Sequence, residues 1–229
     1  MKQKPSPFGA LLTLLSKTIS PGKVKRSLSR AVDDGFVKLG IMPEMMDGSG
    51  KILHISDTPT MMYGHLARLL RRVNPSIVIH TGDLADDIKL DMYPSEADRY
   101  KDAARRLINI LLAPHRRVII ALGNHDRADL LPPLPSQCVV CDNTINMTLY
   151  GATFRMSHYI ERVTDSPEQY NLFGHDPMSE SFVDEEGRYY LNGMDIMRMI
   201  DPVTDEIQFL NYPWSARNAR NMRAGRLAK

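Results

Sequence analysis

Five clusters of polar residues lie where strand-like segments end, and their side chains are of the types that bind divalent metals. Carboxylate, amide and imidazole groups together suit a hard or borderline divalent cation. One such aspartate or histidine alone is as often a helix cap or a core residue, whereas the ordered set indicates a metal site. The clusters are Asp57, Asp83, the pair Asn124 and His125, His158 and His175.

Three apolar strands, separated by two amphipathic helices, must position the first three clusters. The strands are predicted over residues 51–57, 76–83 and 116–126. Continuous apolar strands that alternate with helices predict a parallel sheet that is covered on both faces. Ligands of such a sheet bind beyond the carboxyl ends of its strands. We therefore expect Asp57, Asp83 and Asn124 to face one crevice.

The two intervening segments, 61–73 and 95–113, repeat apolar residues at helical spacing. Each is therefore predicted to be a helix with one buried face. The predicted buried residues are Met62, Leu66, Leu69, Leu70 and Val73 in the first helix, and Tyr100, Ala104, Leu107, Ile108 and Leu111 in the second.

After residue 136 the chain changes to short strand-like segments with turns between them. The segments Asp184–Arg188 and Asp201–Glu206 have the composition of hairpin turns. This half is therefore predicted to be largely antiparallel.

The ordered motifs resemble those of the calcineurin-like metallophosphoesterases. After Asp57 the chain carries GDLAD (Gly82–Asp86), GNHD (Gly123–Asp126), SHY around His158 and FGHD ending at Asp176. The resemblance covers about residues 51–212, and the pair GD and GNHD is quite specific. It implies a four-layer α/β/β/α sandwich with two mixed sheets and a site for two metal ions.

The resemblance assigns one metal position to Asp83, Asn124, His158 and His175, and all four residues are of the expected type. The other position would use Asp57, Asp83 and two histidines, but the chain has Pro59 and Pro177 where those histidines would be. Proline cannot bind a metal through its side chain. We expect one tight ion, most simply Mn²⁺, with Mg²⁺, Fe²⁺ or Zn²⁺ as alternatives, and a second ion that is weak or absent.

Four residues are alternative ligands for the weakened position, namely His54, His80, His65 and Asp176. His54 and His80 each precede a strand-end aspartate by three residues. Because strand side chains alternate between faces, this odd offset predicts that both point away from the site.

The resemblance also implies roles for residues at the substrate. His125 would face the phosphoryl group and protonate or stabilise the leaving oxygen, and Asp86 would orient the imidazole. Asn124, His125 and Arg127 are the predicted substrate-binding residues. The leading hypothesis is metal-dependent hydrolysis of a phosphomonoester or phosphodiester. A metal- or phosphate-binding scaffold without turnover is the first alternative, and a nuclease-like phosphodiesterase is the second.

Charge distribution separates the ends of the chain from its body. The net charge is +2 over 229 residues. Residues 1–50 carry +4 and residues 213–229 carry +5, which leaves −7 in the middle. We predict a helical basic extension over residues 1–49, a metallophosphoesterase-like domain over 50–213 and a basic tail over 214–229. The tail is either a solvated end or a contact for an acidic or nucleic-acid partner.

The basic extension is predicted to hold two short amphipathic helices that either dock on the domain or bind a membrane surface or a partner. Its longest apolar run has eight residues, far fewer than the roughly 20 that a membrane helix needs. The expectation is a cytoplasmic protein with no transmembrane segment and a phosphoester substrate.

Overall fold

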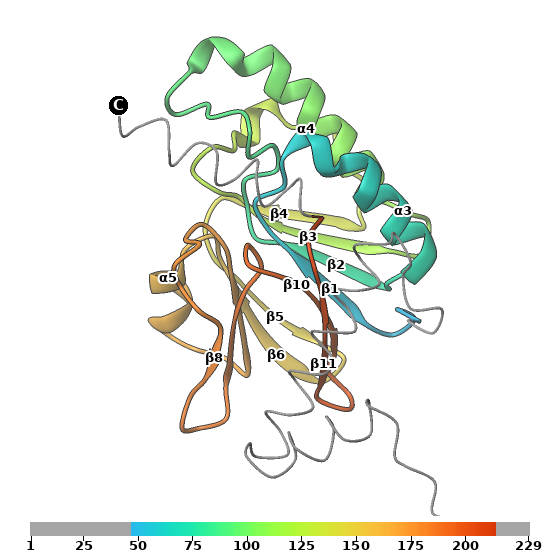
Figure 1. The fold of residues 1–229 in the computed structure, drawn as a ribbon, viewed down its shortest axis with the longest axis vertical. Helices are drawn as coiled ribbons and strands as arrows, with labels where there is room; N and C mark the ends of the chain where they lie inside the picture. Colours follow the sequence, from blue (N-terminus) through green and yellow to red (C-terminus); the bar gives the residue numbers. More distant parts are fainter. Residues whose placement is uncertain (1–46, 214–229) are drawn as a thin grey trace, which may run out of the picture. The chain divides into compact units, whose positions relative to one another are not determined.

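The computed structural model describes residues 47–213. Two mixed β-sheets pack face to face, and helices lie on the outer face of each sheet (Figure 1). This arrangement confirms the predicted α/β/β/α sandwich. The predicted tail over 214–229 and nearly all of the predicted extension over 1–49 lie outside the described residues.

The first sheet has six strands in the order β11-β10-β1-β2-β3-β4. Strands β1 to β4 run parallel, β10 pairs antiparallel with β1, and β11 pairs antiparallel with β10 at the edge of the sheet. The strands are β1 (Ile52–Ile55), β2 (Ile77–His80), β3 (Arg117–Ala121), β4 (Cys138–Cys141), β10 (Met197–Asp201) and β11 (Glu206–Leu210). The first three are the predicted parallel strands.

The second sheet has five strands in the order β5-β6-β7-β9-β8. They are β5 (Ile145–Leu149), β6 (Ala152–Met156), β7 (Tyr170–Phe173), β8 (Phe182–Val183) and β9 (Tyr189–Asn192). Both predicted hairpins are present, one joining β8 to β9 and the other joining β10 to β11.

The prediction of a largely antiparallel second half is wrong for several pairs. Strand β7 is parallel to both β6 and β9, and β4 is parallel to β3 in the first sheet. The helix α5 (Ile160–Thr164) lies in the connection between β6 and β7. This connection lets β7 start from the same end of the sheet as β6, which a tight turn cannot do.

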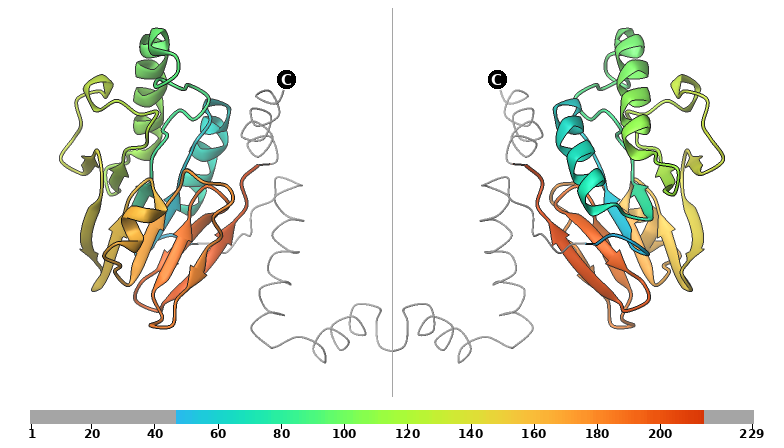
Figure 2. Two further views of the ribbon diagram at one scale, coloured as in Figure 1. Left: turned by 90° about the vertical axis from the view of Figure 1, so that its left-hand side faces the viewer. Right: turned by 90° about the vertical axis from the view of Figure 1, so that its right-hand side faces the viewer.

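Helices α3 (Tyr63–Val73) and α4 (Ala97–Leu111) lie side by side over the first sheet (Figures 1 and 2). All the apolar residues predicted for their inner faces are buried. Three 3₁₀ turns complete the helical segments, η1 (Thr60–Met62), η2 (Pro94–Glu96) and η3 (Ala128–Leu130). No helix in the described part of the chain has both the length and the apolar character that crossing a bilayer requires.

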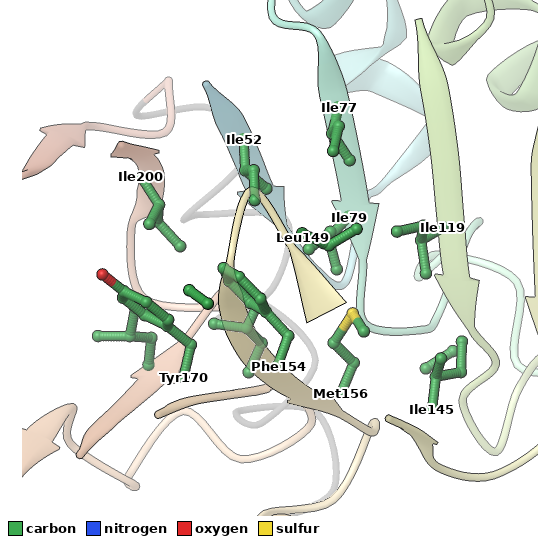
Figure 3. Packing of buried hydrophobic residues seen from close by; sticks show 14 residues of the cluster. Ile52, Ile77, Ile79, Ile119, Ile145, Leu149, Phe154, Met156, Tyr170 and Ile200 are labelled. Atoms are coloured by element: carbon green, nitrogen blue, oxygen red, sulfur yellow. The ribbon is translucent and has the colours of Figure 1, made fainter. Parts of the chain in front are cut away.

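The core between the sheets joins isoleucines of β1 to β3 to larger side chains of the second sheet (Figure 3). Phe154, Tyr170 and Tyr189 stack across β6, β7 and β9, with ring centroids 4.7 and 5.0 Å apart. Stacked aromatic pairs add to the free energy of burial. The stack joins three strands of the second sheet, and the shared core holds the two sheets against each other. The loops at the ends of the sheets therefore meet in a fixed geometry.

Candidate metal centre

Asp57 and Asp83 follow neighbouring parallel strands and meet beyond their carboxyl ends. The N–H of Asp57 donates to the carbonyl of Gly82 at 2.9 Å, and the N–H of Thr58 donates to the carbonyl of Asp83 at 3.0 Å. Both aspartates are buried, with 2% of each exposed. Both also have positive φ angles, 49° and 56°. Such angles are uncommon for residues other than glycine and often mark functional sites.

His158 follows β6 and is completely buried. Its Nδ1 lies 2.7 Å from the carbonyl oxygen of Thr81, which can only accept a hydrogen bond. In the neutral ring the proton is therefore on Nδ1, and Nε2 carries a lone pair. That Nε2 lies 3.2 Å from Asn124 Oδ1 and 3.7 Å from Asp83 Oδ1.

His175 completes the cluster from the end of β7. Its Nδ1 lies 3.1 Å from His158 Nε2, and its backbone N–H donates to Asp57 Oδ2 at 3.1 Å. Its φ angle is also positive, 68°. The structure thus brings together the four residues that the resemblance assigns to the intact position.

The chemistry of this cluster fits a divalent cation. Lone pairs of His158, Asn124 and Asp83 face one another, and a cation is the partner that satisfies several acceptors at once. Ligand atoms of Asp57, Asp83 and His158 all lie within 4.8 Å of one another. Burial, followed by the nearby charge of Asp57, raises the pKa of Asp83 well above its usual range. A cation would relieve that repulsion.

Glycine at position 123 is required by the close approach of two loops. A Cβ atom there would collide with the carboxylate and the backbone nitrogen of Asp83. The G of the GNHD motif therefore lets the loop after β3 pack directly on the loop after β2.

The position expected for a second ion does not fit a metal with imidazole ligands. Pro59 is buried and Pro177 is exposed, and neither can ligate. The structure places Lys89 beside Asp83, with its Nζ 3.8 Å from Asp83 Oδ2, and Lys89 also pairs with Asp86. Lys89 carries no motif signal and was not predicted to belong to the site.

His125 lies at the site but has a different carboxylate partner from the predicted one. Its Nδ1 pairs with Asp91, whereas Asp86 pairs with Lys89. Its Nε2 lies 4.0 Å from Asp83 Oδ2. Burial lowers the pKa of His125, and the charge of Lys89 lowers it further, while Asp91 opposes both. The prediction that Asp86 orients His125 is not supported by these contacts.

Asp91 was missed because it lies in an irregular loop, eight residues beyond Asp83, where spacing alone does not indicate what a side chain reaches. Arg127, predicted to bind substrate, instead makes a two-pronged surface pair with Asp129 at 2.7 and 2.8 Å. None of the contacts among the described residues brings its guanidinium into the cluster.

The alternative ligands for the weakened position lie elsewhere. His54 Nε2 is 3.0 Å from Thr81 Oγ1, and His80 Nε2 is 2.9 Å from Thr58 Oγ1. His65 contacts Arg68 on the exposed side of α3. Asp176 accepts hydrogen bonds from Met178 and Ser179.

Comparison with known proteins agrees with this fold. The family model for calcineurin-like phosphoesterases matches residues 50–222, and the chain belongs to that family. No curated protein matches the chain.

Solved structures with a similar fold include three phosphoesterases. An archaeal phosphodiesterase is 14% identical, with 71% of this chain and 99% of that chain covered and a TM-score of 0.46. The Escherichia coli phosphoesterase YfcE is 16% identical, with 69% and 96% covered and a TM-score of 0.44. A Sphaerobacter thermophilus metallophosphoesterase is 12% identical, with 76% and 94% covered and a TM-score of 0.42.

Proposed function

We propose that this protein is a divalent-metal-dependent phosphoester hydrolase that works with one tightly held cation. Membership of the phosphoesterase family supports the reaction class. The observation that carries the proposal is the lone pair of His158 Nε2, which faces Asn124 Oδ1 at 3.2 Å and Asp83 Oδ1 at 3.7 Å. His158 and Asp83 are buried, and a cation is a partner that their facing acceptor atoms can share.

Asp83, Asn124, His158 and His175 would hold the cation. When bound, the cation would polarise a phosphoryl oxygen of the substrate and lower the pKa of a water molecule. The carboxylate and amide oxygens suit Mn²⁺, our first candidate, and the imidazoles also suit Fe²⁺ or Zn²⁺, with Mg²⁺ as a further alternative.

His125 would act as the general acid. The proton would pass from Nε2 to the leaving oxygen of the substrate, and Asp91 at Nδ1 would stabilise the imidazolium and fix its orientation. Asn124 and His125 would together contact the phosphoryl group. Asp57 would accept a proton from the attacking water. This role is open to Asp57 because Pro59 and Pro177 replace the histidines that would hold a second ion beside it.

A metal- or phosphate-binding scaffold without turnover is the second candidate function. Pro59 and Pro177 favour it, because the altered position no longer offers the ligands of a complete two-metal site. A nuclease-like activity depends on the basic tail over 214–229, which lies outside the described residues.

Hydrolysis assays with Mn²⁺ separate these functions. The substrates are an aryl phosphomonoester, an aryl phosphodiester and a single-stranded oligonucleotide, assayed with the wild type and Asp83→Asn. The proposal predicts Mn²⁺-dependent turnover of at least one ester by the wild type and a loss of at least a hundredfold in the variant. One tight ion with no turnover of any substrate would leave the scaffold as the function.

The matched control is Asp102→Asn. Asp102 is an exposed aspartate of α4 that pairs with Arg105 on the surface. This variant makes the same chemical change away from the cluster, so its turnover should equal that of the wild type.

A further inference from the structure

Lys89 lies in the loop between β2 and η2 and is held there by its neighbours in the sequence. Ile88 and Leu90 are buried, with 1% and 6% exposed. The N–H of Tyr93 donates to the carbonyl of Lys89 at 2.8 Å. Because the side chains on both sides of Lys89 are buried, the backbone of Lys89 is fixed next to the metal cluster.

The ammonium of Lys89 is partly buried among carboxylates. It pairs with Asp86 and lies 3.8 Å from Asp83 Oδ2. Only 15% of the Lys89 side chain is exposed, and the Asp83 side chain is 3% exposed. Ions that lose this much water must keep an opposite charge nearby. Lys89 is therefore part of the charge balance of the cluster.

The two oxygens of Asp83 face different partners. Oδ1 accepts the N–H of His125 at 3.2 Å and lies 3.7 Å from His158 Nε2. Oδ2 lies 3.8 Å from Lys89 Nζ and 4.0 Å from His125 Nε2. Here the second oxygen already has a cation beside it, supplied by the chain.

We propose that the ammonium of Lys89 takes the charge-balancing place of a second metal ion, so that the site binds one divalent cation per chain. Three features agree with this arrangement, namely Pro59 and Pro177 in place of ligands and Lys89 beside Asp83. The inference rests on the proposed metal site. Lys89 acts through Asp83 and is a positioning residue.

The test is the number of Mn²⁺ ions bound by the full-length protein, measured by calorimetric titration and by the electron paramagnetic resonance spectrum. The wild type should bind one ion and give the spectrum of an isolated Mn²⁺. Lys89→Met removes the charge and keeps a similar length. It should bind a second ion at least tenfold more tightly than the wild type does, and show coupling between two Mn²⁺ ions.

Two further variants serve as controls. One keeps the positive charge at position 89, and the other removes a lysine far from the cluster in sequence. Lys89→Arg keeps the charge and should bind one ion. Lys101→Met removes an exposed lysine of α4 and should also bind one ion. Two tight ions in the wild type would overturn the proposal, as would a folded Lys89→Met that still binds only one. The wild-type count decides the matter if Lys89→Met does not fold.

The count of bound ions is independent of turnover. If the wild type binds one ion, Lys89→Met binds two, and neither hydrolyses any ester, the hydrolase proposal fails and the role of Lys89 stands. If the wild type hydrolyses esters with two bound ions, the role of Lys89 and the single-cation site both fail, and only the reaction class of the hydrolase proposal stands.

Discussion

Asp126 accepts the backbone N–H of Asp83 at 2.7 Å through its Oδ2 atom. The same carboxylate accepts the N–H groups of Gly123 at 2.8 Å and Leu84 at 2.9 Å, and the hydroxyl of Tyr100 at 2.9 Å. One side chain thus joins the loop after β2, the loop after β3 and the helix α4. It holds Asp83 close enough to Asn124 and His158 for the three side chains to bind one metal ion.

Asp126→Asn should weaken both the fold and the metal site. An amide cannot accept all these hydrogen bonds, so at least one buried donor loses its partner, at a cost of about 1–3 kcal/mol. Groups that orient metal ligands typically contribute 10–100-fold to affinity, and we expect about that loss for Mn²⁺. Urea unfolding and Mn²⁺ titration measure the two effects. Unchanged Mn²⁺ affinity in Asp126→Asn would show that Asp126 does not position the ligands.

His158→Ala should abolish the stabilisation of the fold by Mn²⁺. A ligand that binds only the folded state at a hundred times its Kd stabilises that state by about 2.7 kcal/mol. The wild type should show a rise in melting temperature with Mn²⁺ that the variant lacks. His65→Ala, at an exposed residue of α3, should keep the rise. An equal rise in His158→Ala would remove His158 from the ligand set.

Gly123→Ala should damage the site by a steric effect alone. The added Cβ collides with the Asp83 carboxylate and backbone, and overpacking of this kind costs about 1–3 kcal/mol. Mn²⁺ affinity should fall together with stability. The matched control is Gly64→Ala in α3, where the nearest atom lies 3.7 Å from the new Cβ. In a helix that change should stabilise the fold by about 0.5–1 kcal/mol.

Asp91→Asn should lower the pKa of His125. The charge of Asp91 and its contact with Nδ1 favour the protonated imidazole, so their removal favours the neutral ring. We expect a decrease, and a smaller one for Asp86→Asn, which loses only a more distant charge. A nuclear magnetic resonance titration of the His125 ring in metal-free protein measures both. A larger decrease for Asp86→Asn would restore Asp86 as the partner.

Local patterning was enough to predict the parallel half of the fold. The strands β1, β2 and β3 are mostly apolar, and their ends were visible because Asp57, Asp83 and Asn124 follow within three residues. Asp57, Asp83 and Asn124 could therefore be placed together from the sequence. The inner faces of α3 and α4 followed from their helical spacing.

The strand directions of the second half could not be read in the same way. The connection between β6 and β7 contains a helix of only five residues, too short to show a periodic pattern. The contacts of Lys89 and Asp91 were also hidden, because an irregular loop brings them to the site and its path depends on where Ile88 and Leu90 are buried.

Three members of the cluster, Asp57, Asp83 and His175, have left-handed backbones. Glycine adopts such angles without steric penalty, and other residues are less stable there by roughly 1 kcal/mol or more. Glycine at these three positions would relieve the backbone strain, but it would remove the metal ligands together with the hydrogen bonds that Asp57 and Asp83 accept from the backbone of His175 and His125. The strained backbone is thus maintained by the same side chains that would bind the metal.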